Sequence, residues 1–457
     1  FNHAVYYFSH FRNAVYTLDI AGVEQPFLAN HFSLITIFYS PLYYVFGSYT
    51  LLVIQIAAIL FGGFFIYKYS LLQFEKATAL PALFVVHFFS IWGIYSALSY
   101  DFHNNVLGAM LVPAFVYFVE KRKIAWSLVF TFLILFTKEV SSIWLVFIVL
   151  GLSVKNRRNI RQTFYKMELP ILLISIIYGI VVIFWLMPKL QGSSQNLQFQ
   201  RYQYFGNSLS DMVVNFAKNP KLIFDALFLN TTNDISYNYI KIETYIMFLL
   251  AGGVFCFYNP AFLVMLISIF AQKFLTNDYA LWGINGQYSI EFVPIISLAT
   301  IDFVRKIKTS KNRKIIAITI VLLTVVSNIK TIDSRQSKWY DAANTNFYNS
   351  AHYTTDLNID EINTAMSLID KDASVSATSL LVPRLAFRDK IYHFPITKNA
   401  DYIVLLKDRN YYPMNEASFK ISLQNIRKNK QYFVLFEGAD IVVFSRVKKL
   451  CFFGKSY

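Results

Sequence analysis

Long apolar runs separated by short polar turns make up most of the chain. Between residues 48 and 329, ten of these runs approach the roughly 20 apolar residues that a helix needs to cross a bilayer, although several are shorter. We therefore predict a transmembrane domain over 48–329 with about ten spans. The predicted spans are 48–70, 79–98, 104–119, 124–137, 142–154, 167–188, 241–258, 260–276, 286–304 and 314–329.

The two ends of the chain lack this pattern. Residues 1–47 mix polar with aromatic side chains, which predicts a non-cytoplasmic loop that carries interfacial helices. Residues 330–457 show short helical and strand periodicities, which predict a soluble α/β domain followed by a basic tail. The predicted elements are helices at 359–369 and 416–428 and strands at 374–377, 402–406, 433–436 and 441–444. The fold class is thus a polytopic α-helical membrane protein with a small C-terminal α/β soluble domain.

Basic residues gather in loops on one side of these spans. The loops 120–123, 155–166 and 305–314 are rich in Lys and Arg, and the span count places all three on the same side. Positively charged loops mark the cytoplasmic side of a membrane protein. The opposite side receives the remaining turns, the first loop and the C-terminal domain. We expect an integral plasma (inner) membrane protein whose C-terminal domain is non-cytoplasmic.

Composition excludes several classes of protein. The chain has 457 residues, 56% of them hydrophobic, and its net charge of +15 is concentrated in the short loops, so we expect no nucleic-acid partner. Cys256 and Cys451 form neither a disulfide framework nor a metal-ligand spacing. There is no serine-hydrolase, zinc or Walker motif, which argues against a protease, a metallohydrolase and an ATP-driven pump. Because the chain begins at Phe1, a further membrane span upstream is an open expectation.

Ionisable side chains at or within a membrane are costly, so each is a functional candidate. Asp101 and His103 share a non-cytoplasmic turn, where they form an acid/base or phosphate-binding pair, or a hydrated turn in which Asp101 caps the next helix. Lys138 and Glu139 interrupt an apolar stretch, where they bind an anionic head group or neutralise each other. His31 precedes an amphipathic run and is either a ligand or an interfacial histidine without one.

Further polar candidates belong to the same side. Gln287 and Glu291 are spaced i, i+4 at the start of the ninth predicted span, with Tyr288 beside them. This spacing predicts one helix face that lines a cavity or anchors the helix at the interface. Arg201 lies in the polar and aromatic loop 189–240, whose amides and rings suit sugar or head-group contacts, although a solvated loop explains them as well.

Short blocks spread along the chain resemble a known family. The blocks are His31-Phe32, 40–43, 51–55, Phe102-His103, Thr137-Lys138-Glu139, 287–294, 375–377, 382–385, 394–395 and 400–402. In this order they resemble the domain-of-unknown-function family 2079, which is itself similar to the GT-C glycosyltransferases. The resemblance implies a multispan fold and transfer of a sugar from a polyprenyl-phosphate donor at the outer face. It also implies an acidic base in the first outer loop and basic or polar residues that hold the donor phosphate.

The chain departs from that pattern at the expected base. Asn2 stands where the resemblance places an Asp, and an amide cannot take the proton of an acceptor hydroxyl. The candidate bases are therefore Asp19, Glu24 and Asp101. The candidate substrate-binding residues are His31, His103, Lys138, Glu139, Arg201, Gln287, Tyr288 and Glu291.

These candidates lead to one hypothesis and two alternatives. The leading hypothesis is a GT-C-like glycosyltransferase that moves a sugar from a polyprenyl-phosphate donor to an acceptor at the outer face. The first alternative is a non-catalytic membrane subunit or scaffold that binds a partner protein in a cell-envelope assembly, and the second is a transporter. The expected partners are a polyprenyl-phosphate lipid or lipid-linked sugar, together with membrane lipids. No motif indicates a cofactor, and a divalent metal stays open.

Overall fold

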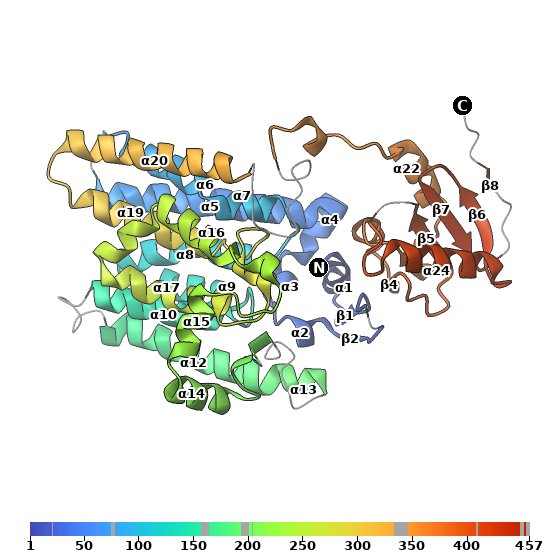
Figure 1. Cartoon of the computed structure of the whole chain (residues 1–457), viewed down its shortest axis with the longest axis horizontal. Helices are drawn as coiled ribbons and strands as arrows, with labels where there is room; N and C mark the ends of the chain where they lie inside the picture. The colour runs from blue at the N-terminus through green and yellow to red at the C-terminus, as the bar shows by residue number, and fades with distance from the viewer. Residues whose placement is uncertain are drawn as a thin grey trace. The chain divides into compact units, whose positions relative to one another are not determined.

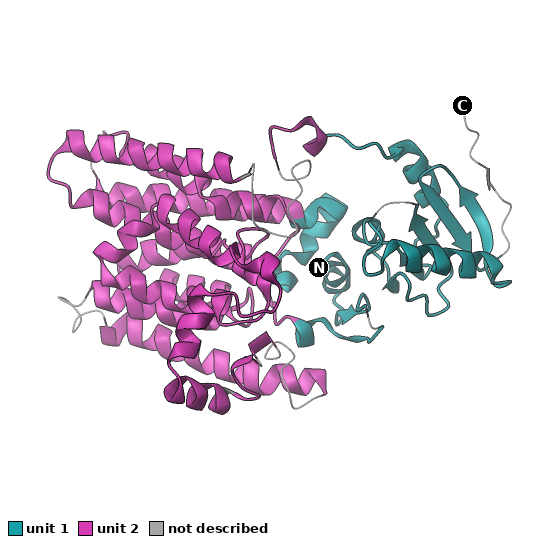
Figure 2. Cartoon of the chain, in the orientation of Figure 1, with its two compact units in different colours: residues 1–30, 36–51, 354–457 teal, residues 31–35, 52–353 magenta. Residues whose placement is uncertain are grey.

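The computed structural model describes residues 1–20, 22–74, 78–156, 164–192, 201–202, 204–332, 346–407, 410–447 and 452–453. Contacts between residues divide the chain into two compact units (Figure 2). The helical unit comprises residues 31–35 and 52–353, and the sheet unit comprises residues 1–30, 36–51 and 354–457. Both ends of the chain therefore belong to the same unit.

The helical unit is built from apolar helices packed side by side (Figure 1). Its main helices are α5 (Thr50–Gln73), α6 (Leu80–Ser90), α7 (Trp92–Leu98), α8 (Asn104–Glu120), α9 (Ile124–Leu135), α10 (Ser141–Lys155), α12 (Leu169–Val181), α16 (Ile240–Leu250), α17 (Pro260–Phe274), α19 (Phe292–Arg305) and α20 (Ser310–Ile332). Shorter helical segments are η4 (Phe164–Glu168), η5 (Val182–Leu186), α13 (Met187–Gln191), α14 (Leu209–Lys218), α15 (Lys221–Phe228), η7 (Ile235–Tyr237), η8 (Gly253–Tyr258), α18 (Tyr279–Trp282) and η9 (Ser350–His352).

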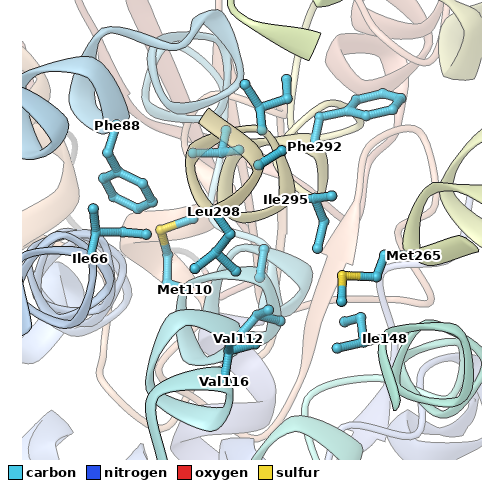
Figure 3. Close-up of a cluster of buried hydrophobic side chains, with 14 of the residues drawn as sticks. Ile66, Phe88, Met110, Val112, Val116, Ile148, Met265, Phe292, Ile295 and Leu298 are labelled. Atoms are coloured by element: carbon cyan, nitrogen blue, oxygen red, sulfur yellow. The ribbon is translucent and has the colours of Figure 1, made fainter. Parts of the chain in front are cut away.

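Helices α8 and α19 lie in the interior of the helical unit. Most side chains of both helices are buried, as expected for helices that are apolar on nearly all sides. Met110 and Val116 of α8 belong to the same hydrophobic cluster as Ile295 and Leu298 of α19, and side chains of α5, α6, α10 and α17 contribute to it (Figure 3). This core fixes the positions of the turns that precede α8 and α19.

Several helices are long and apolar enough to cross a membrane. In the described part of the chain these are the stretches Ile35–Gln73, Phe164–Gln191 and Ser310–Thr331. Helices α6 and α7 meet the same criterion together, although the pair is bent by 49°, and α8, α9, α10 and α17 are apolar but shorter. The second and third stretches leave apolar side chains such as Ile177 and Leu322 exposed, which suits contact with lipid. The chain is a membrane protein, and its number of spans stays a prediction.

Two predicted spans are interrupted. The predicted span 79–98 breaks at Ile91, where the backbone is extended between α6 and α7. The predicted span 241–258 breaks at Gly252, which has a φ of +100° that side-chain-bearing residues rarely adopt. Apolar periodicity therefore located these segments but did not reveal their breaks.

The basic loops meet at one end of the helical unit. Lys155 Nζ lies 2.6 Å from Glu120 Oε1 and 2.7 Å from the Tyr69 hydroxyl, which joins the C-terminal ends of α5, α8 and α10. Arg305, at the end of α19, donates to the side chain of the last residue of α5 at 2.9 Å. These helices therefore end together, as the predicted alternation of loops between two sides requires. Residues 157–163 of the second basic loop lie outside the described residues.

The sheet unit combines elements from both ends of the chain. Its N-terminal part holds α1 (Asn2–Ser9), β1 (Val15–Tyr16), β2 (Gln25–Pro26), α2 (Phe27–Asn30), most of α3 (Ile35–Tyr39), η1 (Ser40–Leu42), α4 (Tyr43–Phe46) and η2 (Gly47–Tyr49). Its C-terminal part holds α22 (Ile359–Ser367), β3 (Val375–Ala377), α23 (Val382–Leu385), β4 (Ile391–His393), β5 (Tyr402–Leu406), α24 (Glu416–Lys428), β6 (Phe433–Glu437), β7 (Ile441–Ser445) and β8 (Phe452–Phe453).

The strands of the C-terminal part form a sheet in the order β4-β3-β5-β7-β6-β8. β3 pairs in parallel with β4 and β5, whereas β7 pairs antiparallel with β5 and β6. Ile362 of α22 and Phe419 of α24 belong to two separate hydrophobic clusters that draw on opposite faces of β5. The predicted strand 402–406, the helix 416–428 and the hairpin of β6 and β7 are confirmed.

The N-terminal helix α1 is fastened to the C-terminal part of the sheet unit. The Asn2 amide donates to the carbonyl of Pro383 at 3.0 Å, and the Tyr7 hydroxyl donates to the carbonyl of Asp389 at 2.9 Å. Arg12 pairs with the Asp389 carboxylate at 2.6 Å, and this contact holds the pKa of Asp389 below its ordinary value. The predicted domain boundaries at residues 47 and 329 mark where the long apolar runs begin and end. The sheet unit instead joins residues that precede these runs with residues that follow them.

Candidate functional site

The turn between α9 and α10 carries Lys138 and Glu139. Glu139 is 3% exposed, its Oε2 accepts the backbone N–H of Phe32 at 3.1 Å, and its Oε1 lies 3.7 Å from His31 Nδ1. The Ser33 hydroxyl donates to the carbonyl that precedes Lys138 at 2.7 Å. Segment 31–35 is thereby held against this turn, and the Glu139 carboxylate is its buried anchor.

Burial and charge decide the protonation of this pair. Burial favours a raised pKa for Glu139, but the contact with His31 and the Lys138 charge together outweigh it, and the pKa of Glu139 lies below its ordinary value of 4.5. Burial, followed by the Lys138 charge, lowers the pKa of His31 below 6.5. Near pH 7 the carboxyl group is therefore ionised and the His31 imidazole is neutral. A neutral imidazole offers one N–H donor and one acceptor nitrogen.

The Lys138 ammonium takes no part in this anchor. Lys138 is partly exposed, and its ammonium forms no hydrogen bond or ion pair with the residues that the structure describes. Its charge nonetheless acts on His31, His103, Glu139 and Glu291, so it lies among them. Because Glu139 is engaged by Phe32 and His31, the Lys138 charge is available to an anion.

The turn between α7 and α8 brings His103 to the same group. The His103 N–H donates to Gln55 Oε1 at 3.1 Å, and the His103 and Tyr100 ring centroids are 5.8 Å apart. Burial, followed by the Lys138 charge, lowers the pKa of His103 to about 3, so its ring is neutral near pH 7. Asp101 is exposed, and its Oδ1 accepts the next N–H of the chain at 2.7 Å. It does not cap α8, whose first turn has no side-chain cap.

The segment before α19 is a turn rather than the predicted start of a helix. Helix α19 begins at Phe292, and turns occupy the preceding residues, where Gly286 has a φ of +63°. Glycine adopts this left-handed conformation without the steric cost that a side chain would add. The prediction that Gln287 and Glu291 share one helix face is therefore wrong, because neither residue lies on the helix.

Asn105 of α8 connects these two residues instead. Its Nδ2 donates to the Gln287 carbonyl at 3.3 Å and to Glu291 Oε1 at 2.9 Å. Gln287 and Glu291 are both buried. The N-terminal end of α8, which follows His103 directly, is thereby joined to the turn before α19.

Lys273 of α17 is buried against this turn. Its ammonium donates to the carbonyls of Gly283 at 2.7 Å and Tyr288 at 3.1 Å, and to the Ser289 hydroxyl at 3.2 Å. Lys273, Tyr288 and Glu291 line a cavity of about 10 Å³, which holds roughly one water molecule. The Lys273 side-chain nitrogen is thus already engaged by oxygens of this turn.

Arg201 reaches the same end of the helical unit from the loop after α13. Its carbonyl accepts the N–H of Asn277 at 3.3 Å, and its Nε lies 3.8 Å from Asp278 Oδ2. The Arg201 charge acts on His31 and Tyr288, so the guanidinium lies near both. Its side chain is 44% exposed, which leaves it accessible to a ligand.

The candidates from the first loop lie in the sheet unit. Glu24 Oε1 pairs with Lys398 Nζ at 2.8 Å. Asp19 lies in the connection between β1 and β2, and Asn2 begins α1. Asp101 is thus the candidate base that shares a unit with Lys138, and the roles of Asp19 and Glu24 stay predictions.

Sequence reasoning missed three polar residues of this group. Lys273 interrupts the apolar run 260–276, and the cost of a charge inside a span was a signal that marked it. Gln55 and Asn105 carry no comparable signal, because their partners lie 48 and 182 to 186 positions away in the sequence.

The assembled group combines accessible cations with neutral imidazoles. Its members are His31, His103, Lys138, Glu139, Arg201, Gln287, Tyr288 and Glu291, and they come from turns that are far apart in the sequence. Lys138 and Arg201 carry the positive charge that suits an anion. In the described ranges, no three or more His, Cys, Asp or Glu side chains are placed to hold a metal ion.

A comparison with known proteins identifies the family of the chain. No curated protein matches it. Residues 3–443 match the model of a family described as predicted membrane protein, DUF2079, and the match includes residues of both compact units. The chain therefore belongs to the DUF2079 family of predicted membrane proteins.

Proposed function

We propose that the protein is a membrane glycosyltransferase of the GT-C type, which moves a sugar from a polyprenyl-phosphate donor to an acceptor at the non-cytoplasmic face. The observation that carries the proposal is the Lys138 ammonium, which has no hydrogen bond or ion pair among the described residues. A donor phosphate gains negative charge as its sugar leaves. A preorganised cation stabilises that charge more in the transition state than in the ground state.

The phosphate site consists of two cations and two neutral rings. Lys138 and Arg201 supply the charge, and the rings of His31 and His103, whose lowered pKa keeps them neutral near pH 7, border the site without adding charge. The nearby carboxylate of Glu139 interacts with the Lys138 charge, but it is bonded to the Phe32 N–H and forms no ion pair with Lys138 in the described part of the chain. An arriving phosphate thus meets an ammonium that needs to give up no partner among the described residues.

Asp101 is the proposed base. The acceptor hydroxyl oxygen attacks the anomeric carbon, the bond from that carbon to the phosphate oxygen breaks, and the hydroxyl proton passes to the carboxylate. Asp101 is exposed to an incoming acceptor and lies two residues from His103. The sheet unit, which holds Asp19 and Glu24, is proposed to recognise the acceptor.

Mass spectrometry of lipids extracted from the gently purified protein tests the proposal. We expect a polyprenyl phosphate, or its glycosylated form, with the wild type and at least about tenfold less with Lys138→Ala, because a hydrogen bond to a charged group is lost. Lys123→Ala is the matched control, since this exposed lysine lies in the turn between α8 and α9. Asp101→Asn should retain the lipid and reduce transfer by roughly 10²- to 10⁴-fold.

Two results would contradict the proposal. If Asp101→Asn and Lys138→Ala both turn over at the wild-type rate, Asp101 is not the base and Lys138 is not a ligand of the phosphate. Bulk phospholipid alone, together with a stoichiometric partner protein, would identify a non-catalytic subunit of an envelope assembly instead.

A further inference from the structure

The Gln287 side chain carries an unmet hydrogen-bonding group beside the proposed phosphate site. Gln287 is 3% exposed, and its Oε1 is buried without a hydrogen-bond partner in the described part of the chain. A buried polar atom in this state is less stable than one with a hydrogen-bond partner. Water or a ligand group with an O–H or N–H donor would satisfy it.

The surroundings of Gln287 hold this amide in place. Asn105 Nδ2 and the Ile290 N–H both donate to the Gln287 carbonyl, at 3.3 Å each. The Tyr288 side chain lies beside the Gln287 amide. The backbone at Gln287 is therefore fixed by two hydrogen bonds, neither of which uses Oε1.

An exposed aromatic ring adjoins the same turn. Tyr100 is 62% exposed, and a Cβ atom built on Gly286 would lie 3.8 Å from its ring. The ring also lies beside His103, with centroids 5.8 Å apart. An aromatic face attracts the weakly positive C–H bonds of a sugar ring, because the face carries the negative part of the ring quadrupole.

Charge links this corner to the phosphate site. The charge of Arg201 acts on Tyr288, and the charge of Lys138 acts on Glu291. The Glu291 carboxylate accepts a hydrogen bond from the Asn105 amide, which also donates to the Gln287 carbonyl. A sugar attached to a phosphate at Lys138 and Arg201 would therefore extend toward the turn before α19.

We infer that Tyr100 and Gln287 form the subsite for the sugar of the donor. The Tyr100 ring stacks on one face of the sugar, and Gln287 Oε1 accepts a hydrogen bond from one of its hydroxyl groups. Entry requires a small shift of the exposed Tyr100 ring or of the Gln287 side chain, which lies on a turn and not in a helix. The inference rests on the proposed function and adds to it the recognition of the transferred group.

Binding of two lipids to the full-length protein in nanodiscs tests this subsite. The probes are a polyprenyl monophosphate and the same lipid carrying a hexose, and the measured quantity is the ratio of their dissociation constants. We expect the wild type to prefer the glycosylated lipid, and Gln287→Leu to lower that preference about tenfold without changing the affinity for the bare phosphate. Gln73→Leu, at the basic end of α5, is the control and should keep the preference.

Tyr100 supplies a second and independent readout. Because its side chain is mostly exposed, Tyr100→Ala should fold normally and lose the sugar preference, whereas Tyr100→Phe should keep it. A wild type without sugar preference, or an unchanged preference in both Gln287→Leu and Tyr100→Ala, would overturn the subsite while lipid-phosphate binding still stood. If the wild type binds neither lipid, the proposed function fails and the subsite fails with it.

Discussion

At the scale of single residues, the neighbours Lys138 and Glu139 have opposite environments. Glu139 is buried, its carboxylate accepts the Phe32 N–H, and His31 lies beside it. Lys138 is partly exposed, and among the described residues no group pairs with it. Since leaving a buried charge without its partner is expensive, Glu139 should matter for stability and Lys138 for binding.

The first prediction concerns Glu139→Gln. We expect the free energy of unfolding to fall by about 1–3 kcal/mol at pH 7, because the neutral amide is a weaker acceptor for the Phe32 N–H and attracts His31 less. Thermal unfolding in detergent measures this change. The control is Glu416→Gln, whose pair with Lys420 is 57% exposed on both sides and should contribute little.

The same variant gives a pH dependence with a defined sign. The pKa of Glu139 is lower in the folded protein than its ordinary value of 4.5. Its stabilising contribution is therefore complete above pH 4.5 and declines as the pH falls below that value. The difference in stability between wild type and Glu139→Gln should shrink over this range, and a difference that is constant with pH would contradict the assignment.

At the scale of elements, α7 packs closely on the turn before α19. A Cβ atom at Gly93 of α7 would lie 2.5 Å from the Ser289 carbonyl oxygen and 2.8 Å from the Val293 side chain. The Ser289 oxygen belongs to the backbone, so it cannot move aside as a flexible side chain does. This close approach holds the turn that carries Gln287 against the helix that leads to His103.

We therefore predict that Gly93→Ala destabilises the helical unit by about 1–3 kcal/mol, because the added methyl group overpacks the contact. It should also weaken lipid-phosphate binding, because the turns before α8 and α19 would separate. Gly283→Ala is the matched control: its Cβ atom would lie 3.4 Å from the Ile240 side chain, and its φ of −79° suits alanine. Equal unfolding temperatures for the two variants would refute the close-packing argument.

At the scale of the whole molecule, polar turns of the helical unit separate into two groups. Lys155 and Glu120 join the C-terminal ends of α8 and α10, whereas the turns that precede these helices carry the candidate site. Because these helices begin at one group of turns and end at the other, successive turns must alternate between the two ends of the helical unit. The basic group fits the cytoplasmic face by the rule for positive loops.

Labelling with a membrane-impermeant maleimide in intact cells checks this orientation. Single cysteines replace Asp101, Lys121 and Glu416 in a chain in which Cys451 is serine, and the buried Cys256 is retained. We expect Asp101→Cys and Glu416→Cys to react before lysis and Lys121→Cys to react only after the membrane is disrupted. The reverse pattern would place the candidate site at the cytoplasmic face.

Local patterns in the sequence predicted some elements closely and others poorly. The strand β5 and the helix α24 have the predicted bounds, because a short buried run and an amphipathic period each decide their own conformation. The helix expected from residue 286 begins only at Phe292, because Gly286 and the contacts of Asn105 and Lys273 favour a turn. A long apolar run indicates that a segment is buried in a membrane or in a protein core. It does not indicate where the backbone of that segment bends.

The sequence by itself determined that the chain is a membrane protein and which family it belongs to, and it placed Asp101 and Lys138 between apolar runs, since these follow from composition, spacing and order. Only the tertiary structure decided how those residues divide their tasks. Glu139 holds a segment whose bonding residue lies 107 positions earlier, Asn105 joins a turn up to 186 positions later, and Lys138 remains available. Partners so distant are chosen by the packing of helices, which no local pattern encodes.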